Sequence, residues 1–135
     1  MESQIVVGVS GLERQLQLSW AIDESLQLNV GLLIVHCFAD RFETELPDPS
    51  DEQVHAAKTI IEHAVVVAQG LGLTPDAKLC DGFVGEELVK ASEGARLLVI
   101  GSSHRSRLSH ALHSSVSMYC VRHAHCPVTI VPIAS

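Results

Sequence analysis

The sequence predicts a single α/β domain over residues 1–135, built on an open five-stranded parallel sheet in the order 3-2-1-4-5 with helices on both faces. Short apolar runs typical of buried strands alternate with stretches that have the helical period of 3.6 residues. Such alternation implies parallel strands joined by right-handed crossovers. The chain of 135 residues also lies within the usual size range of one domain.

The N-terminal segment predicts a strand followed by a helix. Gln4–Val9 is a run of mostly β-branched residues that ends at the turn Ser10-Gly11. The segment after this turn has helical spacing and ends at Asn29. The helix face expected to be buried consists of Leu18, Ala21, Ile22 and Ser25.

A second strand, a loop and a long helix are expected next. Gly31–His36 is a short apolar run of the kind found in strands buried on both faces, and the acidic, proline-containing Phe38–Pro49 is typical of a surface loop. Ser50 as N-cap and Gln53 three residues later form a capping box. This helix should end at Gly70 and Gly72, and one of its faces is lined by Val54, Ala57, Ile61, Ala64, Val65 and Ala68.

The second half of the chain repeats the alternation of strands and helices. The expected elements are a strand Leu73–Cys80, a short helix Gly85–Glu93, a strand Arg96–Ile100, a helix capped by Ser114 or Ser115 that runs through Val116, Tyr119, Cys120 and His123, and a last strand Pro127–Pro132.

The predicted sheet also indicates where a small ligand binds. Ligands of open parallel sheets bind beyond the carboxyl ends of the strands, at the point where the strand order reverses. With the first and fourth strands as neighbours, this point lies between the turn Ser10-Gly11 and the loop that begins at Gly101. We therefore expect the binding site between these two segments.

Composition excludes several classes of protein. The formal net charge of −7 disfavours nucleic acid as a partner, because affinity for phosphate backbones depends on clustered Lys and Arg. No apolar block approaches the roughly 20 residues of a membrane-spanning helix, and the N-terminus shows no secretion signal. The four irregularly spaced cysteines are typical of reduced thiols, so we expect a cytoplasmic location.

Several segments of the chain match one family pattern in order and spacing. They are Ile5–Val9, Trp20-Ala21, Val35-His36, Val99–Ser102, Ser114–Ser117 and Arg122–Val128. Together they resemble the universal stress protein family over essentially the whole chain. The resemblance implies a Rossmann-like fold, a binding or regulatory role in stress response rather than an enzyme activity, and a homodimer that pairs through the last strand, Val128–Val131.

The resemblance also implies an adenine nucleotide, ATP or AMP with Mg²⁺, bound by the pattern G-x2-G-x9-G-[S/T] after the fourth strand. Here the three glycine positions are Gly101, His104 and Ser114, and the hydroxyl position is Ser115. The acidic residue that the family has at the end of the first strand is Ser10. Losing a charged hydrogen-bond acceptor costs on the order of 1.5–3 kcal/mol. These departures predict ATP binding that is weakened from micromolar to millimolar, or lost.

The remaining positions of the predicted site follow from the same resemblance. Cys37 lies where the family's backbone recognises adenine, and His104 and Arg105 are candidates for direct phosphate contact. The whole predicted site comprises Val9, Ser10, Gly11, Cys37, Gly101, Ser102, His104, Arg105, Ser114, Ser115, Val116 and Ser117.

Other groupings of reactive residues favour less specific roles. The histidines at 104, 110 and 113 and the cluster Cys120, His123, His125 and Cys126 have the donors of a metal site, yet a polar loop and packing roles explain them better. We expect His36 to make a structural hydrogen bond. Serines between 102 and 117 have no acidic orienter for catalysis, and phosphorylation there remains a hypothesis.

A second function class stays open beside nucleotide sensing. In it the nucleotide site has been abandoned and the chain is a protein-interaction or regulatory dimer. The contact surfaces would be the acidic segment Phe38–Pro49 and the histidine-containing loop after Gly101.

Overall fold

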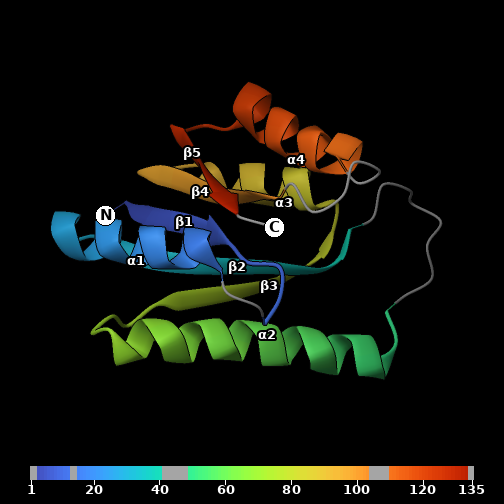
Figure 1. Ribbon diagram of the computed structural model, residues 1–135, viewed down its shortest axis with the longest axis horizontal. Coiled ribbons are helices and arrows are strands. Elements are labelled where there is room, and N and C mark those ends of the chain that lie inside the picture. The colour runs from blue at the N-terminus through green and yellow to red at the C-terminus, as the bar shows by residue number, and fades with distance from the viewer. Residues whose placement is uncertain (1–2, 13–14, 41–48, 104–109, 134–135) are drawn as a thin grey trace.

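The computed structural model describes residues 3–12, 15–40, 49–103 and 110–133. In this part of the chain five parallel strands form one sheet in the order β3-β2-β1-β4-β5, as predicted (Figure 1). The elements are β1 (Gln4–Gly8), α1 (Leu16–Leu28), β2 (Gly31–Asp40), α2 (Asp51–Gly70), β3 (Asp76–Gly82), α3 (Val84–Ser92), β4 (Leu97–Ser103), α4 (His110–His123) and β5 (Val128–Ile133).

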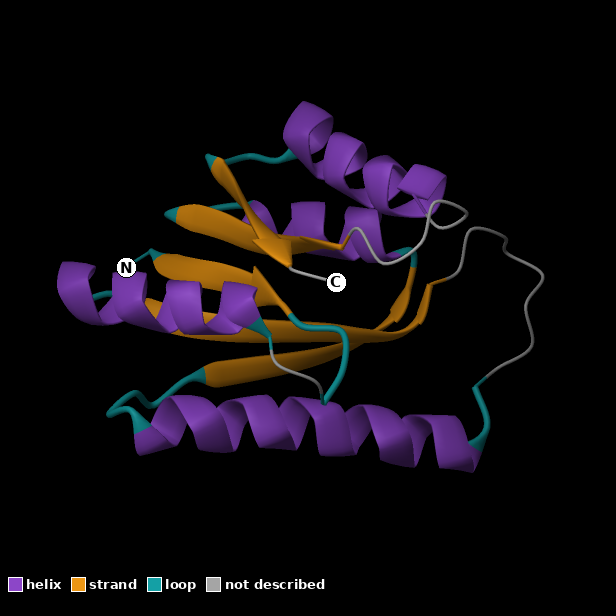
Figure 2. Cartoon of the chain, viewed as in Figure 1, coloured by secondary structure: helices purple, strands orange, loops and turns teal. Residues whose placement is uncertain are grey.

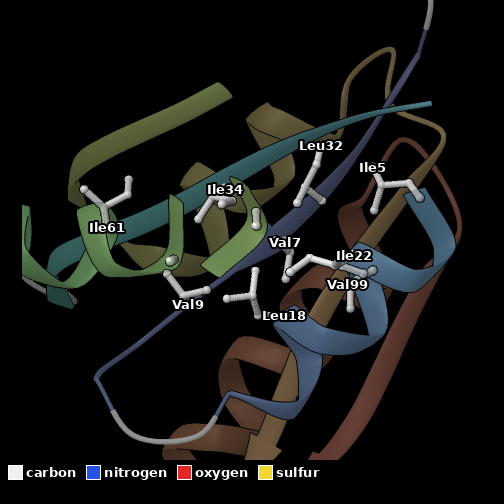
Figure 3. Packing of buried hydrophobic residues seen from close by; sticks show 12 residues of the cluster. Ile5, Val7, Val9, Leu18, Ile22, Leu32, Ile34, Ile61 and Val99 are labelled. Atoms are coloured by element: carbon white, nitrogen blue, oxygen red, sulfur yellow. The ribbon is translucent and has the colours of Figure 1, made fainter. Parts of the chain in front are cut away.

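Helices cover both faces of the sheet, and each face has its own apolar core (Figure 2). Helices α1 and α2 pack on one face, where Val7 and Val99 of neighbouring strands lie close to Leu18 and Ile22 of α1 (Figure 3). Helices α3 and α4 pack on the other face. Alternate residues of β1 serve the two cores, since Val7 belongs to the first and Val6 to the second. This explains why the strand is apolar without alternation.

Local signals determine the ends of α1 and α2 as predicted. Asn29 ends α1 in the left-handed conformation, at φ 54°, and its N–H donates to the Ser25 carbonyl. At the start of α2 the Ser50 hydroxyl accepts from the Gln53 N–H, and the Gln53 side chain accepts from the Ser50 N–H. No helix in the described residues is both long and apolar enough to cross a membrane.

Two strands extend further than the sequence predicts. β2 continues past His36 to Asp40, which pairs with Gly82 of β3, so the start of the expected loop Phe38–Pro49 belongs to the sheet. β4 continues through Gly101 to Ser103, because these residues pair with the end of β5. The prediction that a loop begins at Gly101 is therefore wrong. Strand ends depend on partners far away in sequence, which an apolar run does not reveal.

Smaller corrections concern β3, α3 and β5. The third strand begins at Asp76 instead of Leu73, and α3 begins one residue earlier than predicted, at Val84. The last strand begins at Val128 and includes Ile133. It lies at the edge of the sheet, as expected.

The helix before the last strand also begins earlier than predicted. α4 begins at His110, so neither Ser114 nor Ser115 caps it; both lie within the helix. The helical spacing of Val116 and Cys120 extends back to Leu112, four residues before Val116. This periodicity outweighs the preference of serine for helix ends, which is weak beside tertiary packing.

The cap of α2 gives a first testable prediction. Replacing Ser50 with alanine removes the hydroxyl that satisfies the Gln53 N–H, so we expect Ser50→Ala to lower the free energy of unfolding by about 1 kcal/mol. Urea denaturation measures this change. Ser19→Ala, at an exposed position inside α1, is the matched control and should leave stability nearly unchanged. Equal effects of the two substitutions would contradict the capping role.

Candidate functional site

A cavity of about 280 Å³ lies at the carboxyl ends of β1, β2 and β4. It therefore lies where β1 and β4 are neighbours and the strand order reverses. Helices α1, α3 and α4 complete its wall. The lining residues are Gly8, Val9, Ser10, Gln17, Val35, His36, Cys37, Val84, Leu88, Ile100, Gly101, Val116 and Ser117.

Two hydrogen bonds fix the backbone where β1 enters the cavity. The Val9 N–H donates to the Val35 carbonyl at 2.9 Å, and the His36 Nδ1 donates to the Val9 carbonyl at 2.7 Å. Since a carbonyl oxygen only accepts, this contact places the proton on Nδ1 of His36. The imidazole is buried, with 6% of its surface exposed. The structural hydrogen bond predicted for His36 is thus present, and it holds Ser10 at the cavity.

The lining of the cavity is largely aliphatic and carries no Asp, Glu, Lys or Arg among the described residues. Its polar side-chain groups are few. They are the Ser10 and Ser117 hydroxyls, the Cys37 thiol, the His36 ring and the Gln17 carboxamide. An apolar cavity with a small number of polar groups is typical of a site for a neutral or weakly polar part of a small ligand.

The structure brings together half of the predicted site. Val9, Ser10, Cys37, Gly101, Val116 and Ser117 line the cavity. Gly11 and Ser102 are adjacent in sequence to lining residues but do not belong to the lining. Ser114 and Ser115 lie in α4, before its lining residues. His104 and Arg105 lie outside the described residues.

Sequence reasoning missed the remaining lining residues for different reasons. Gly8, His36 and Ile100 each precede a predicted site residue directly, and Val35 lies two residues before Cys37, so a site extended by two residues back along each strand would have included them. Val84 and Leu88 come from α3, and only tertiary packing brings that helix to the cavity. Gln17 carried a usable signal, because it is a polar residue beside the apolar face of a predicted helix.

Burial sets the chemistry of the cysteines. Cys120 is fully buried, and desolvation raises the pKa of its thiol to about 11. Burial, followed by the nearby Glu87 carboxylate, raises the pKa of Cys80, and burial also raises the pKa of Cys126. No two of the four cysteines, all of them within the described ranges, form a disulfide. Thiols of this kind are poor nucleophiles and poor metal ligands.

The cluster around Cys120 has the packing role that the sequence favoured. Cys120 belongs to the core between the sheet and α3 and α4. The His123 ring packs against Tyr119, with ring centroids 4.4 Å apart. Within the residues that the structure describes, no three His, Cys, Asp or Glu side chains form a group that could hold a metal ion.

Comparison with known proteins identifies the family. A profile of the universal stress protein family matches residues 1–132. The chain belongs to the universal stress protein family. A universal stress protein of Mycobacterium tuberculosis is 31% identical over 138 residues, and the match covers 94% of this chain and 47% of the relative. The chain thus spans about half the length of the curated relatives it matches.

Solved structures of universal stress proteins share the fold. A complex described as a universal stress protein with cAMP superimposes with a TM-score of 0.75 at 23% identity, over 96% of this chain and 97% of the other. The universal stress protein of Archaeoglobus fulgidus in complex with dAMP gives a TM-score of 0.69 at 21% identity, over 96% and 97%. The sheet order 3-2-1-4-5 is therefore that of a universal stress protein.

The raised pKa of Cys120 gives a prediction about reactivity. At pH 8 the thiol stays protonated in the folded protein, because the pH lies about three units below its pKa, whereas unfolding returns the pKa towards its ordinary value of about 8.5. We expect iodoacetamide to alkylate Cys120 only after unfolding, as measured by peptide mass spectrometry with and without urea. Alkylation in the folded state at a rate equal to that in urea would contradict this burial. Cys37, which is only partly buried, is the internal comparison.

Proposed function

We propose that this universal stress protein is a sensing module for an adenine nucleotide, with ATP binding weaker than a complete phosphate-binding motif would give. The observation that carries the proposal is the neutral, mainly aliphatic cavity at the reversal of the sheet. Its volume of about 280 Å³ is near the lower end of the range of small-molecule sites, about 300–1,000 Å³. It suits the base and sugar of one nucleotide.

Family membership supports the choice of ligand. Two structures with the same fold are described as complexes with cAMP and with dAMP, each an adenine nucleotide with a single phosphate. The shared fold places the carboxyl ends of β1, β2 and β4 around the cavity here. We therefore assign the cavity to an adenine nucleotide, with AMP as the first ligand to test.

The composition of the lining supports weak binding of ATP with Mg²⁺. A triphosphate and its metal ion need charged partners or a close backbone cradle. The described lining contains no charged side chain, and Ser10 offers a neutral hydroxyl where the family pattern has a carboxylate. A neutral hydrogen bond contributes about half as much as a charge-assisted one. We infer a preference for the monophosphate.

We also infer a binding role and no catalytic one. The serine and cysteine side chains of the lining have no acidic residue beside them, within the described lining, that would orient a general base. The described lining also has no charged side chain that would stabilise a developing charge. We also propose a cytoplasmic location.

Titration calorimetry tests the proposed ligand. We expect AMP to bind with a dissociation constant between about 10 μM and 1 mM, and ATP with Mg²⁺ to bind at least several-fold more weakly, because the described lining offers no charged partner for the extra phosphates. Absence of binding by AMP, ADP and ATP at millimolar concentration would contradict the proposal.

Thiol labelling then tests whether the ligand occupies this cavity. Cys37 lines it and is partly buried, whereas Cys126 lies outside the lining. AMP at saturating concentration should slow alkylation of Cys37 by N-ethylmaleimide and leave the rate at Cys126 unchanged. Equal rates at Cys37 with and without AMP would place the ligand elsewhere.

A second candidate function, an interaction dimer, is favoured by the exposed apolar surface at one edge of the sheet. Ile130 of the edge strand β5 is 40% exposed, and Val121 of the adjacent α4 is 53% exposed. An apolar edge strand presents unpaired N–H and C=O groups that can pair with another chain. We propose a homodimer through Val128–Val131, whether or not nucleotide is bound.

Light scattering tests the dimer. The unmodified protein should have twice the monomer mass of 14.5 kDa at tens of micromolar, and Ile130→Lys should be monomeric because a lysine on an edge strand opposes pairing. Val66→Lys is the control and should remain dimeric. Val66 is an exposed apolar residue of α2, which packs on β2 and β3, at the other end of the sheet from β5. A monomeric mass for the unmodified protein would overturn this assignment.

A further inference from the structure

Gln17 is the one carboxamide in the described lining of the cavity. It lies in the first turn of α1 and is 2% exposed, so it is buried like its apolar neighbour Leu18. Glutamine is rarely buried to this degree unless its polar atoms are hydrogen-bonded. The position therefore requires a reason beyond packing.

A chain of hydrogen bonds through Gln15 and Gln17 determines which way the Gln17 amide faces. The Ser10 N–H donates to the Gln15 Oε1 at 3.1 Å, and the Gln17 Nε2 donates to the same oxygen at 2.7 Å. The Gln17 Nε2 also donates to the Gly8 carbonyl at 3.2 Å. A backbone N–H only donates and a carbonyl only accepts, so neither amide can be turned over without losing a bond. The nitrogen of Gln17 is committed, and its oxygen is an acceptor.

Among the described residues that acceptor has no partner. The Gln17 Oε1 is buried and receives no hydrogen bond from any described group of the protein. An unmade hydrogen bond at a buried oxygen destabilises the site, and a donor that reaches the oxygen recovers this free energy. Gln17 lines the cavity, so a donor group on a ligand there can supply the missing hydrogen bond.

We propose that Gln17 is a specificity-determining residue that accepts a hydrogen bond from an N–H or O–H group on the nucleoside part of the ligand. The proposal rests on the proposed nucleotide function and adds to it the chemistry that the site selects. A ligand is favoured only if it has a polar hydrogen where it faces the Gln17 Oε1. One with a carbonyl or ring acceptor there meets an oxygen and is disfavoured.

The polar hydrogen can come from two parts of adenosine monophosphate, and a ligand series distinguishes them. Purine riboside 5′-monophosphate lacks the exocyclic amine, and inosine 5′-monophosphate replaces it with a carbonyl. The 2′-deoxy and 3′-deoxy forms of AMP each lack one sugar hydroxyl. Affinities measured by calorimetry on the unmodified protein should show one position whose deletion weakens binding about tenfold, as expected for one hydrogen bond to a buried acceptor.

The substitution Gln17→Met assigns the discrimination to this residue. Methionine has a similar length without an amide, so the variant should bind AMP about tenfold more weakly and should no longer distinguish AMP from the deleted analogue. Because both ligands are compared on the same folded variant, any effect on stability cancels. Gln27→Met, at an exposed glutamine of the same helix, is the control and should retain the full ratio.

The outcomes separate the two proposals. Equal binding of AMP and all four analogues by the unmodified protein, or a ratio that survives Gln17→Met, overturns the role of Gln17 while nucleotide binding stands. Lack of binding by every nucleotide at millimolar concentration overturns both. If Gln17→Met does not fold, the ligand series on the unmodified protein and on Gln17→Asn, whose shorter side chain withdraws the oxygen, still decides the question.

Discussion

The structure depends on the central position of β1, which forms parallel ladders with β2 on one side and β4 on the other. Its residues are buried on both faces, since Val6 is 1% and Val7 0% exposed. After β1 the chain leads to α1 on one face of the sheet, whereas after β4 it leads to α4 on the other face (Figure 1). The connections therefore diverge beyond β1 and β4, and the cavity lies at that divergence.

The same constraint explains why the cavity has a defined wall. Both polar groups of the Val9 backbone are used by β2, one through Val35 and one through the His36 ring. The backbone is thus fixed for one residue beyond the end of β1, and the turn begins only at Ser10. Gln15, the N-cap residue of α1, and Gln17 in its first turn then connect this turn to the helix, from the Ser10 N–H to the Gly8 carbonyl. Strand, turn and helix form one hydrogen-bonded unit around the site.

What the sequence reveals depends on the range of the interactions involved. Ser50 and Gln53 interact within one helical turn, and Asn29 acts on the helix it ends, so both ends were predictable. The end of β4 is different, because Gly101 stays in the strand only through its pairing with Val131, thirty residues later. The alternation of strand and helix patterns indicated a parallel sheet with right-handed crossovers. The order 3-2-1-4-5 was adopted as one order of that class, and the structure has it. No such rule locates the ends of paired strands.

The candidate site shows the same limit. Ser10 and Gly101 were predicted to be near each other from the strand order alone, and both line the cavity. The contribution of Leu88 depends on how α3 packs against the sheet, which its apolar period does not specify. The state of the Gln17 oxygen depends on hydrogen bonds whose donors and acceptors must be placed to within tenths of an ångström.

A neutral site has consequences for what the proposed sensor can detect. Without charged partners in the described lining, affinity has to come from apolar contact and single neutral hydrogen bonds, each contributing about 1 kcal/mol. At the weak end of the expected range, a dissociation constant near a millimolar corresponds to about 4 kcal/mol of net binding free energy, which is what remains after the cost of immobilising the ligand. Occupancy of a site this weak follows ligand concentration in the millimolar range and would saturate only slightly at micromolar levels. Weak neutral recognition therefore suits a module that reports large changes in an abundant ligand, with one buried acceptor providing selectivity that charge does not supply.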